Sequence, residues 1–140
     1  MLKRKVFLLA IVSFAFEHQG CQRQNKKSSC KNIHDGTFYY HTGNKKYKII
    51  RQDNYHFEVD LATNDTAIYL AKWVTDCTLN LIFRSTTMKL TNRQNSFMKG
   101  NPIDIEIKYI SRSFYTFSLK TNYSSIPEDT VWLNPKHVIY

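Results

Sequence analysis

The chain has 140 residues, the size of one ordinary domain, and its formal net charge is +9. Hydrophobic residues make up 42% of it, with nine Tyr and nine Phe, which is enough to fill a core and excludes a largely disordered chain. Only four glycines occur, which excludes a collagen-like protein and nearly excludes a phosphate-binding loop. The basic residues are scattered along the chain, so they indicate a solvated surface, and nucleic acid is not an expected partner.

The first segment, residues 1–20, is predicted to be a secretory signal peptide. Lys3, Arg4 and Lys5 form a basic stretch, and an apolar run follows at 6–16. This run is too short to cross a bilayer as a helix, which takes about 20 residues. The basic flank and the terminal position are typical of a signal for export, so the segment is left out of the folded domain.

Gly20 and Cys21 stand where a bacterial lipoprotein signal places its acylated cysteine. We therefore predict that Cys21 is lipidated and that residues 21–34 form a polar tether between the lipid and the domain. The protein would then be held at a membrane of the cell envelope, in the periplasm or at the outer-membrane surface. The alternative is ordinary cleavage after Ala15, which would make the protein freely secreted.

Three cysteines in an exported chain leave an odd one over. If Cys21 carries lipid, Cys30 and Cys77 remain, and an oxidising compartment favours a disulfide between them. Closing a loop of this size is worth roughly 4 kcal/mol in the chain-entropy treatment. Without lipidation Cys21 is also free to pair, and a buried free thiol at Cys77 is a further alternative. No metal site is predicted, because no C-x₂-C pair exists and the histidines show no ligand spacing.

From residue 36 onward the sequence predicts short β-strands separated by polar turns. The expected strands lie at 37–41, 46–51, 55–60, 66–75, 78–84, 103–109, 114–120 and 130–133. Alternation within three of them assigns these side chains to the core: Leu79, Leu81, Phe83, Ile103, Ile105, Ile107, Tyr109, Tyr115, Phe117 and Leu119. The stretch 85–102 has no clear periodicity and is expected to be a polar, basic loop.

The connections between these strands are mostly short enough for hairpins, which predicts antiparallel neighbours. Residues 35–140 are therefore expected to form a single all-β domain, an up-and-down meander of about eight strands. Such a meander closes into a small barrel or half-barrel, lipocalin-like, which is either filled by side chains or holds one small ligand. A two-sheet β-sandwich is the alternative.

Several short motifs run through the first half of this domain. They are Cys30, Gly36-Thr37-Phe38, Arg51, Glu58 and Lys72-Trp73-Val74-Thr75-Asp76-Cys77, followed by Leu79 and Leu81. In these motifs the chain resembles a family of small exported bacterial lipoprotein-like proteins of unknown function. The resemblance implies a lipoprotein-type N-terminus and supports the pairing of Cys30 with Cys77. Members of that family sometimes carry a topoisomerase label, but this chain is far too short for such chemistry and has a signal for export.

Catalytic motifs are missing from the sequence: it has no nucleophile elbow, P-loop, dinucleotide-binding fingerprint or zinc-protease helix. Glu58 and Asp60 share one strand face, as do Asp104 and Glu106, and facing carboxylates can act as an acid–base pair. We favour a structural interpretation, in which both pairs face outward and form ion pairs with Lys and Arg on neighbouring strands. His56, between two aromatic residues, is likewise expected to face outward.

The sequence therefore predicts a non-enzymatic, lipid-anchored protein of the cell envelope that acts as a binding or structural module, without a cofactor. Its partners would be the membrane, through the lipid, and a small apolar ligand, an envelope polymer or another protein. Two alternatives stay open. One is an envelope hydrolase that uses the strand carboxylates, and the other is a basic secreted factor that binds a polyanion.

Overall fold

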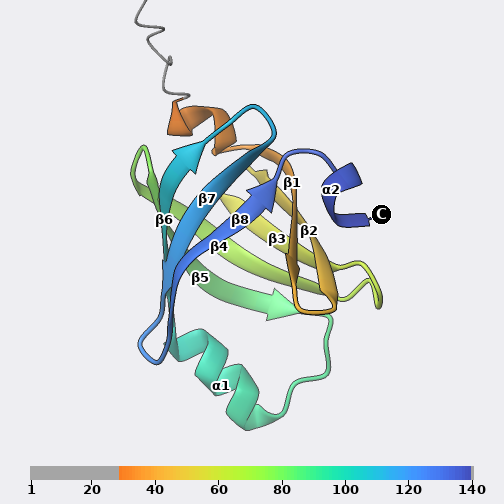
Figure 1. The fold of residues 1–140 in the computed structure, drawn as a ribbon. Helices are drawn as coiled ribbons and strands as arrows, with labels where there is room; N and C mark the ends of the chain where they lie inside the picture. Colours follow the sequence, from red (N-terminus) through yellow and green to blue (C-terminus); the bar gives the residue numbers. More distant parts are fainter. Residues whose placement is uncertain (1–28, 140) are drawn as a thin grey trace, which may run out of the picture.

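The protein's computed structural model describes residues 29–139, which form a closed barrel of eight antiparallel strands (Figure 1). The strands follow one another around the barrel in chain order, and the last one pairs with the first. They are β1 (Gly36–Thr42), β2 (Lys45–Gln52), β3 (Tyr55–Asp60), β4 (Thr66–Thr75), β5 (Thr78–Thr86), β6 (Ile103–Ile110), β7 (Phe114–Lys120) and β8 (Ser125–Trp132). The predicted meander barrel is confirmed, and the sandwich alternative is wrong.

Apolar side chains that alternate along the strands fill the barrel from within. The inward residues predicted for β5 and β7 are confirmed as members of this core or as packed against it: Leu79, Leu81, Phe83, Tyr115, Phe117 and Leu119. Tyr115 and Leu79 are fully buried. The core therefore lies along the barrel axis, and the few polar side chains that point into the barrel are surrounded by apolar ones.

The two ends of the barrel are covered by different elements (Figure 1). A 3₁₀ turn, η1 (Cys30–Ile33), lies across one end with Cys30 and Ile33 buried. These residues fall within the expected tether 21–34, so the fold includes residues before the expected boundary at 35. Helix α1 (Asn92–Gly100) lies at the opposite end, and α2 (Lys136–Ile139) follows β8. Within residues 29–139 no helix has the length and apolar character needed to cross a membrane.

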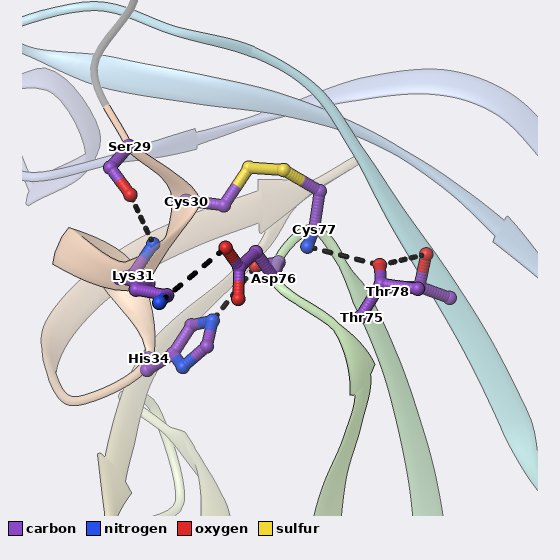
Figure 2. The surroundings of a disulfide bond; sticks show 8 residues. All are labelled: Ser29, Cys30, Lys31, His34, Thr75, Asp76, Cys77 and Thr78. Atoms are coloured by element: carbon purple, nitrogen blue, oxygen red, sulfur yellow. Dashed lines mark hydrogen bonds and ion pairs between the residues drawn. A yellow bond between two sulfur atoms is a disulfide. The ribbon is translucent and has the colours of Figure 1, made fainter.

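The disulfide predicted between Cys30 and Cys77 is present and fastens η1 to the turn between β4 and β5 (Figure 2). The two Cα atoms lie 5.2 Å apart. The turn itself is ordered by Thr75, whose Oγ1 accepts a hydrogen bond from the Cys77 backbone N–H at 3.2 Å. The covalent link thus closes a loop that contains the first four strands, with a sequence separation of 47 residues.

Helix α1 occupies part of the stretch 85–102, so the prediction that this stretch is a loop is wrong. Its start is fixed by a capping box: Thr91 Oγ1 accepts from the Gln94 backbone N–H at 3.2 Å, and Gln94 Oε1 accepts from the Thr91 backbone N–H at 2.9 Å. None of its residues is buried, so the sequence has no apolar stripe at helical spacing that would have predicted the helix.

Tyr109 in β6 was expected on the inward face and lies outside, with 56% of its surface exposed. The register of β6 against β7 shifts between Ile107 and Tyr109, and such a bulge turns the following side chain to the other face. Ile105 and Ile107 stay buried, so the prediction fails only beyond the bulge.

Strand β8 begins at Ser125, five residues before the expected start, and takes in Pro127. A central strand does not tolerate proline, because its N–H is missing from the ladder. Here the register of β7 against β8 shifts between Phe117 and Leu119, and neither Pro127 nor Glu128 has a partner on β7. On its other side β8 meets β1 at a single residue pair, Tyr39 with Trp132, so the missing N–H costs nothing there.

Candidate functional site

The guanidinium of Arg51, at the inner face of β2, is buried in the barrel, with 3% of the residue exposed. It donates three hydrogen bonds: Nε to His56 Nδ1 at 3.2 Å, Nη1 to the Ile33 carbonyl at 3.0 Å and Nη2 to the Tyr115 hydroxyl at 2.8 Å. A charge can stay buried only when its hydrogen-bonding groups are satisfied. Arg51 therefore binds η1, β3 and β7 to one another at the centre of the fold.

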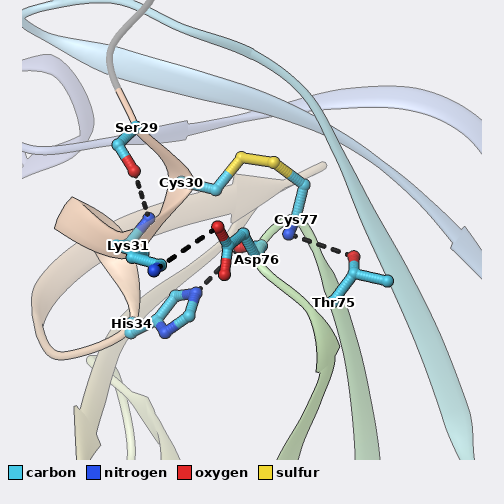
Figure 3. A network of polar contacts seen from close by, with 7 residues as sticks. All are labelled: Ser29, Cys30, Lys31, His34, Thr75, Asp76 and Cys77. Atoms are coloured by element: carbon cyan, nitrogen blue, oxygen red, sulfur yellow. Dashed lines mark hydrogen bonds and ion pairs between the residues drawn. A yellow bond between two sulfur atoms is a disulfide. The ribbon is translucent and has the colours of Figure 1, made fainter.

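Aromatic rings enclose the same guanidinium. Its Cζ lies 5.0 Å from the ring centroid of Phe38 and 5.7 Å from that of Trp73, within the range of a cation–π interaction. Trp73 in turn stacks on the His34 ring at 3.7 Å. His34 Nε2 lies 2.8 Å from the Asp76 carbonyl oxygen, and Lys31 forms an ion pair with the Asp76 carboxylate (Figure 3). The disulfide end of the barrel is thus closed by packed rings as well as by the covalent bond.

His56 connects Arg51 to a carboxylate. It stands directly opposite Arg51 in the register of β2 and β3, and only 1% of it is exposed. Because a guanidinium can only donate, His56 Nδ1 must accept, and the imidazole proton sits on Nε2, 3.1 Å from Glu58 Oε1. Burial lowers the pKa of His56, and the hydrogen bond to Glu58 opposes that shift. The network therefore runs from a cation through a neutral imidazole to a carboxylate.

The prediction that His56, Glu58 and Asp60 face outward is wrong. Their strand has bulky side chains on both faces, so alternation alone does not decide which face turns inward. The register settles it, because Arg51 lies inside and needs an acceptor from the residue opposite, His56. Glu58 and Asp60 share the face of His56, and both line hollows of the barrel interior.

The second acidic pair lies outside, as predicted. Asp104 Oδ1 accepts a hydrogen bond from Asn80 Nδ2 at 2.7 Å, and Glu106 forms an ion pair with Lys108. The two carboxylate pairs are thus separated by the wall of the barrel. The hydrolase alternative requires two carboxylates that converge in one cleft, and these two pairs do not share one.

A small cavity of about 60 Å³ lies beside the network, lined by Arg51, His56 and Glu58 among others. It has room for water but is far below the roughly 300 Å³ of a typical small-molecule site. Tyr40 borders it and donates a hydrogen bond to Asp129 Oδ2 at 2.8 Å. Burial and the nearby carboxylate raise the pKa of Tyr40 to about 12, so its hydroxyl remains a donor. The centre of the barrel is therefore filled by its own side chains.

A larger hollow of about 150 Å³ opens at the α1 end, and we call it the mouth chamber. It lies between Tyr47, Glu58, Asp60, Ala67, Tyr69 and Met98. Glu58, whose side chain is 34% exposed, lines both this chamber and the inner cavity. A crevice of about 220 Å³ shares Tyr69 and Met98 with the chamber and extends it along α1. The polar interior of the barrel is therefore reached from the α1 end.

Tyr69 brings an unused hydrogen-bond donor to the mouth chamber. Only 6% of the residue is exposed, and its ring packs edge-on against the rings of His56 and Phe83, each at 5.8 Å. Burial raises the pKa of Tyr69, so the hydroxyl keeps its proton. Among residues 29–139 that hydroxyl has no hydrogen-bond partner. The residue is buried, but its hydroxyl oxygen keeps contact with solvent, so it can donate to a ligand or to water in the chamber.

Helix α1 covers the mouth chamber but is only loosely attached. Met98 is half-buried, and Phe97 is 52% exposed although its ring contacts Tyr123 at 5.2 Å. Asn101 caps the end of the helix, and its Nδ2 donates to the Phe97 carbonyl at 2.6 Å. Its Oδ1 is buried and has no partner among residues 29–139. A segment with so little buried apolar surface opens at low free-energy cost. Helix α1 borders the opening of the chamber through Met98.

The lowered pKa of His56 predicts a pH-dependent stability. Above about pH 6.5 the residue is neutral in both states; below it the unfolded chain takes up a proton that the folded protein does not. The free energy of unfolding should therefore fall by up to about 1.4 kcal/mol per pH unit as the pH drops from 6.5 toward the folded-state pKa. Urea denaturation between pH 7.5 and 5 measures this.

The variant His56→Asn is the test of that slope. Its amide oxygen can still accept from Arg51, but it cannot titrate, so the profile between pH 6.5 and 5 should flatten even though the protein is less stable throughout. The exposed His41 provides the control, since His41→Asn should leave the slope unchanged. A slope that persists in His56→Asn would show that another group causes it.

The remaining predicted sites stand as follows. Cys21 lies outside the described residues, and its lipidation stays a prediction. Within residues 29–139 no group of three His, Cys, Asp or Glu side chains is placed to hold a metal ion. The burial of Arg51 was not predicted, although Arg51 lies two residues after the buried Ile49 and therefore on the same face of the strand.

Comparison with protein-family models, with curated proteins and with solved structures found no match to this chain.

Proposed function

We propose that this protein is a non-enzymatic, lipid-anchored binding module of the cell envelope, and that it holds a small ligand in the mouth chamber. The observation that carries the proposal is the asymmetry of the barrel. One end is blocked by η1, the disulfide and stacked rings, and the centre is filled around Arg51. The other end opens into a chamber beneath a loosely attached helix. A blind hollow with a movable cover suits binding and release.

Binding is favoured over catalysis by the state of the polar groups. A general base must reach the proton that it abstracts, yet His56 Nδ1 accepts from Arg51 and its Nε2 proton goes to Glu58. These groups hold one another, and a substrate would have to displace a buried guanidinium to engage the imidazole. The described geometry thus supports a scaffold role for the network and a binding role for the chamber next to it.

Obstructing the mouth chamber should abolish ligand capture. Met88 lines the chamber and is 39% exposed, so Met88→Trp adds bulk there without entering the core. The protein would be incubated with a small-molecule extract of its native host, desalted and denatured, and the released compounds identified by mass spectrometry. We expect at least one compound to be retained by the wild type and to fall about tenfold or more in the variant.

The matched control for this experiment is Val74→Trp. Val74 is 61% exposed on β4, a strand that runs from the α1 end to the disulfide end, and it lies near the latter. This variant carries the same new side chain and should retain the compound as the wild type does. Equal retention by all three proteins, or retention by none, would contradict a ligand site in the mouth chamber and would favour a polymer or another protein as the partner.

Lipid anchoring predicts a definite mass for the protein purified from its native host. The intact mass should begin at Cys21 and include acyl chains, and Cys21→Ser should move the protein from the membrane fraction to the soluble fraction. Two acyl chains are enough for stable anchoring. A mass that begins near Phe16 without lipid would refute the anchor and identify the protein as freely secreted, with Cys21 available for pairing.

A further inference from the structure

We propose that the mouth chamber takes a small organic ammonium ion, a proposal that rests on the function inferred above and names its ligand class. The first argument is charge. Glu58, Asp60 and Asp65 line the chamber, and Lys45 is its one cationic lining residue among those described. The hollow is therefore acidic, in a chain whose net charge is +9. Such local reversal of sign attracts a cation to this position and repels anions from it.

The carboxylates also have oxygens to spare. Glu58 Oε1 accepts from His56, while Oε2 has no hydrogen-bond partner among residues 29–139. Asp60 Oδ1 accepts from the Ala62 backbone N–H at 2.9 Å, and its Oδ2 is likewise unpaired within that range. Both free oxygens belong to residues that line one hollow. They supply negative charge for a cation without any rearrangement of the barrel.

Aromatic rings supply the second requirement of an ammonium site. Tyr47 and Tyr69 line the chamber, and Tyr40 stacks on Tyr47 with ring centroids 6.3 Å apart. The faces of such rings attract quaternary and protonated amines, which proteins bind in cages of aromatic side chains. Met98 closes the chamber from α1 and adds an apolar contact for methyl or methylene groups. A hydrated metal ion gains nothing from these apolar surfaces.

The unused hydroxyl of Tyr69 narrows the ligand further. The side chain of Tyr69 is buried, with 6% of the residue exposed, and its hydroxyl has no protein partner among the described residues. It calls for an acceptor atom on the ligand, such as a hydroxyl or carbonyl oxygen next to the ammonium group. At about 150 Å³ the chamber alone suits an amino alcohol or a similarly small molecule, and the adjoining crevice of about 220 Å³ leaves room for a substituent.

Isothermal titration of the full chain with choline is the direct test. The control ligand is 3,3-dimethyl-1-butanol, which has the same shape and hydroxyl but carries no charge. We expect choline to bind and the neutral isostere to bind about tenfold more weakly or not at all. Equal binding of the two compounds, or no binding of choline at millimolar concentration, would overturn the proposal.

Three variants assign the interaction to its residues, and a fourth is the control. Glu58→Gln keeps an acceptor for His56 but loses the charge. Asp60→Asn keeps an acceptor for the Ala62 N–H and also loses the charge, and each of these two changes should weaken choline binding about tenfold. Glu106→Gln, on the outer face, should not change it. Tyr69→Phe should weaken binding of choline but not of tetramethylammonium, which has no acceptor. Unchanged affinity in both acidic variants, with native thermal unfolding curves, would refute the site.

A free amine and a choline-type lipid headgroup present the same ammonium chemistry. Co-sedimentation with phosphatidylcholine vesicles, using protein that lacks its own lipid, separates these sources. Vesicle binding that free choline competes away would identify the headgroup; choline binding without vesicle binding would identify a soluble amine. If choline fails but Met88→Trp still loses a compound from the host extract, the ammonium class is wrong while the binding function stands.

Discussion

Replacing Arg51 with Met is expected to lower the free energy of unfolding by about 3–5 kcal/mol. The substitution removes three hydrogen bonds at once, and it leaves the Ile33 carbonyl and His56 Nδ1 without a donor in a buried site. It also removes the positive charge that His56 connects, by two hydrogen bonds, to the Glu58 carboxylate. Since a domain of this size is stable by only about 5–15 kcal/mol, the loss is a large share of the total.

Denaturation in urea, with the disulfide intact, measures this effect. Arg84→Met is the matched control, because Arg84 is exposed on β5, and we expect a change below about 0.5 kcal/mol there. Arg51→Lys should fall between the wild type and Arg51→Met, since an ammonium keeps the charge but lacks the planar fork that reaches three acceptors. A loss of less than about 1 kcal/mol in Arg51→Met would mean that apolar packing replaces the network at no cost.

Reducing the disulfide is expected to cost about 4 kcal/mol, the chain-entropy value for a closed loop of this size. The bond holds η1 on the barrel end, and η1 supplies the Ile33 carbonyl that Arg51 binds. Loss of the bond should therefore weaken the Arg51 network as well as free the chain end. The double variant with Cys30→Ser and Cys77→Ser should match the reduced wild type in urea denaturation.

The two large effects should also be coupled. If η1 detaches when the bond is lost, one of the three acceptors of Arg51 goes with it, so Arg51→Met should cost less in the reduced protein than in the oxidised one. Cys21→Ser, made in protein that lacks its lipid and measured with the Cys30–Cys77 bond present, is the control for removal of a thiol. Identical stability of the oxidised and reduced proteins would show that η1 stays docked without the covalent link.

The barrel could be predicted from the sequence because most strands alternate apolar and polar residues between short turns. Leu79, Leu81 and Phe83 illustrate this, since a single buried face leaves one choice of orientation. The strand of His56 allows two orientations, because either its aromatic face or its polar face could turn toward the inside of the barrel. Its orientation depends on a partner in another strand, Arg51, and a long-range pairing of that kind is not written in local periodicity.

The candidate site shows the same limit. The number of cysteines, the predicted export and the family resemblance together favoured the Cys30–Cys77 bond, while pairing with Cys21 and a free Cys77 thiol stayed open. The mouth chamber depends instead on where α1 docks, and α1 buries none of its residues. Its capping box was visible at Thr91 and Gln94, yet a cap without an apolar stripe is a weak signal for a helix. The unused Tyr69 hydroxyl could be recognised only once the side chains around it were placed.

The barrel is closed between β1 and β8, and we call this junction the seam. If it opened, β1 and β8 would become the two edge strands of a sheet. The ladder there consists of the single pair Tyr39 with Trp132, and the Tyr40–Asp129 hydrogen bond bridges the same two strands at the level of side chains. Few backbone hydrogen bonds need to break for the ring of strands to part at this place. The freed strands could then accept a strand from a second molecule. The Tyr40–Asp129 hydrogen bond therefore helps to hold the two strands together where the backbone ladder is shortest.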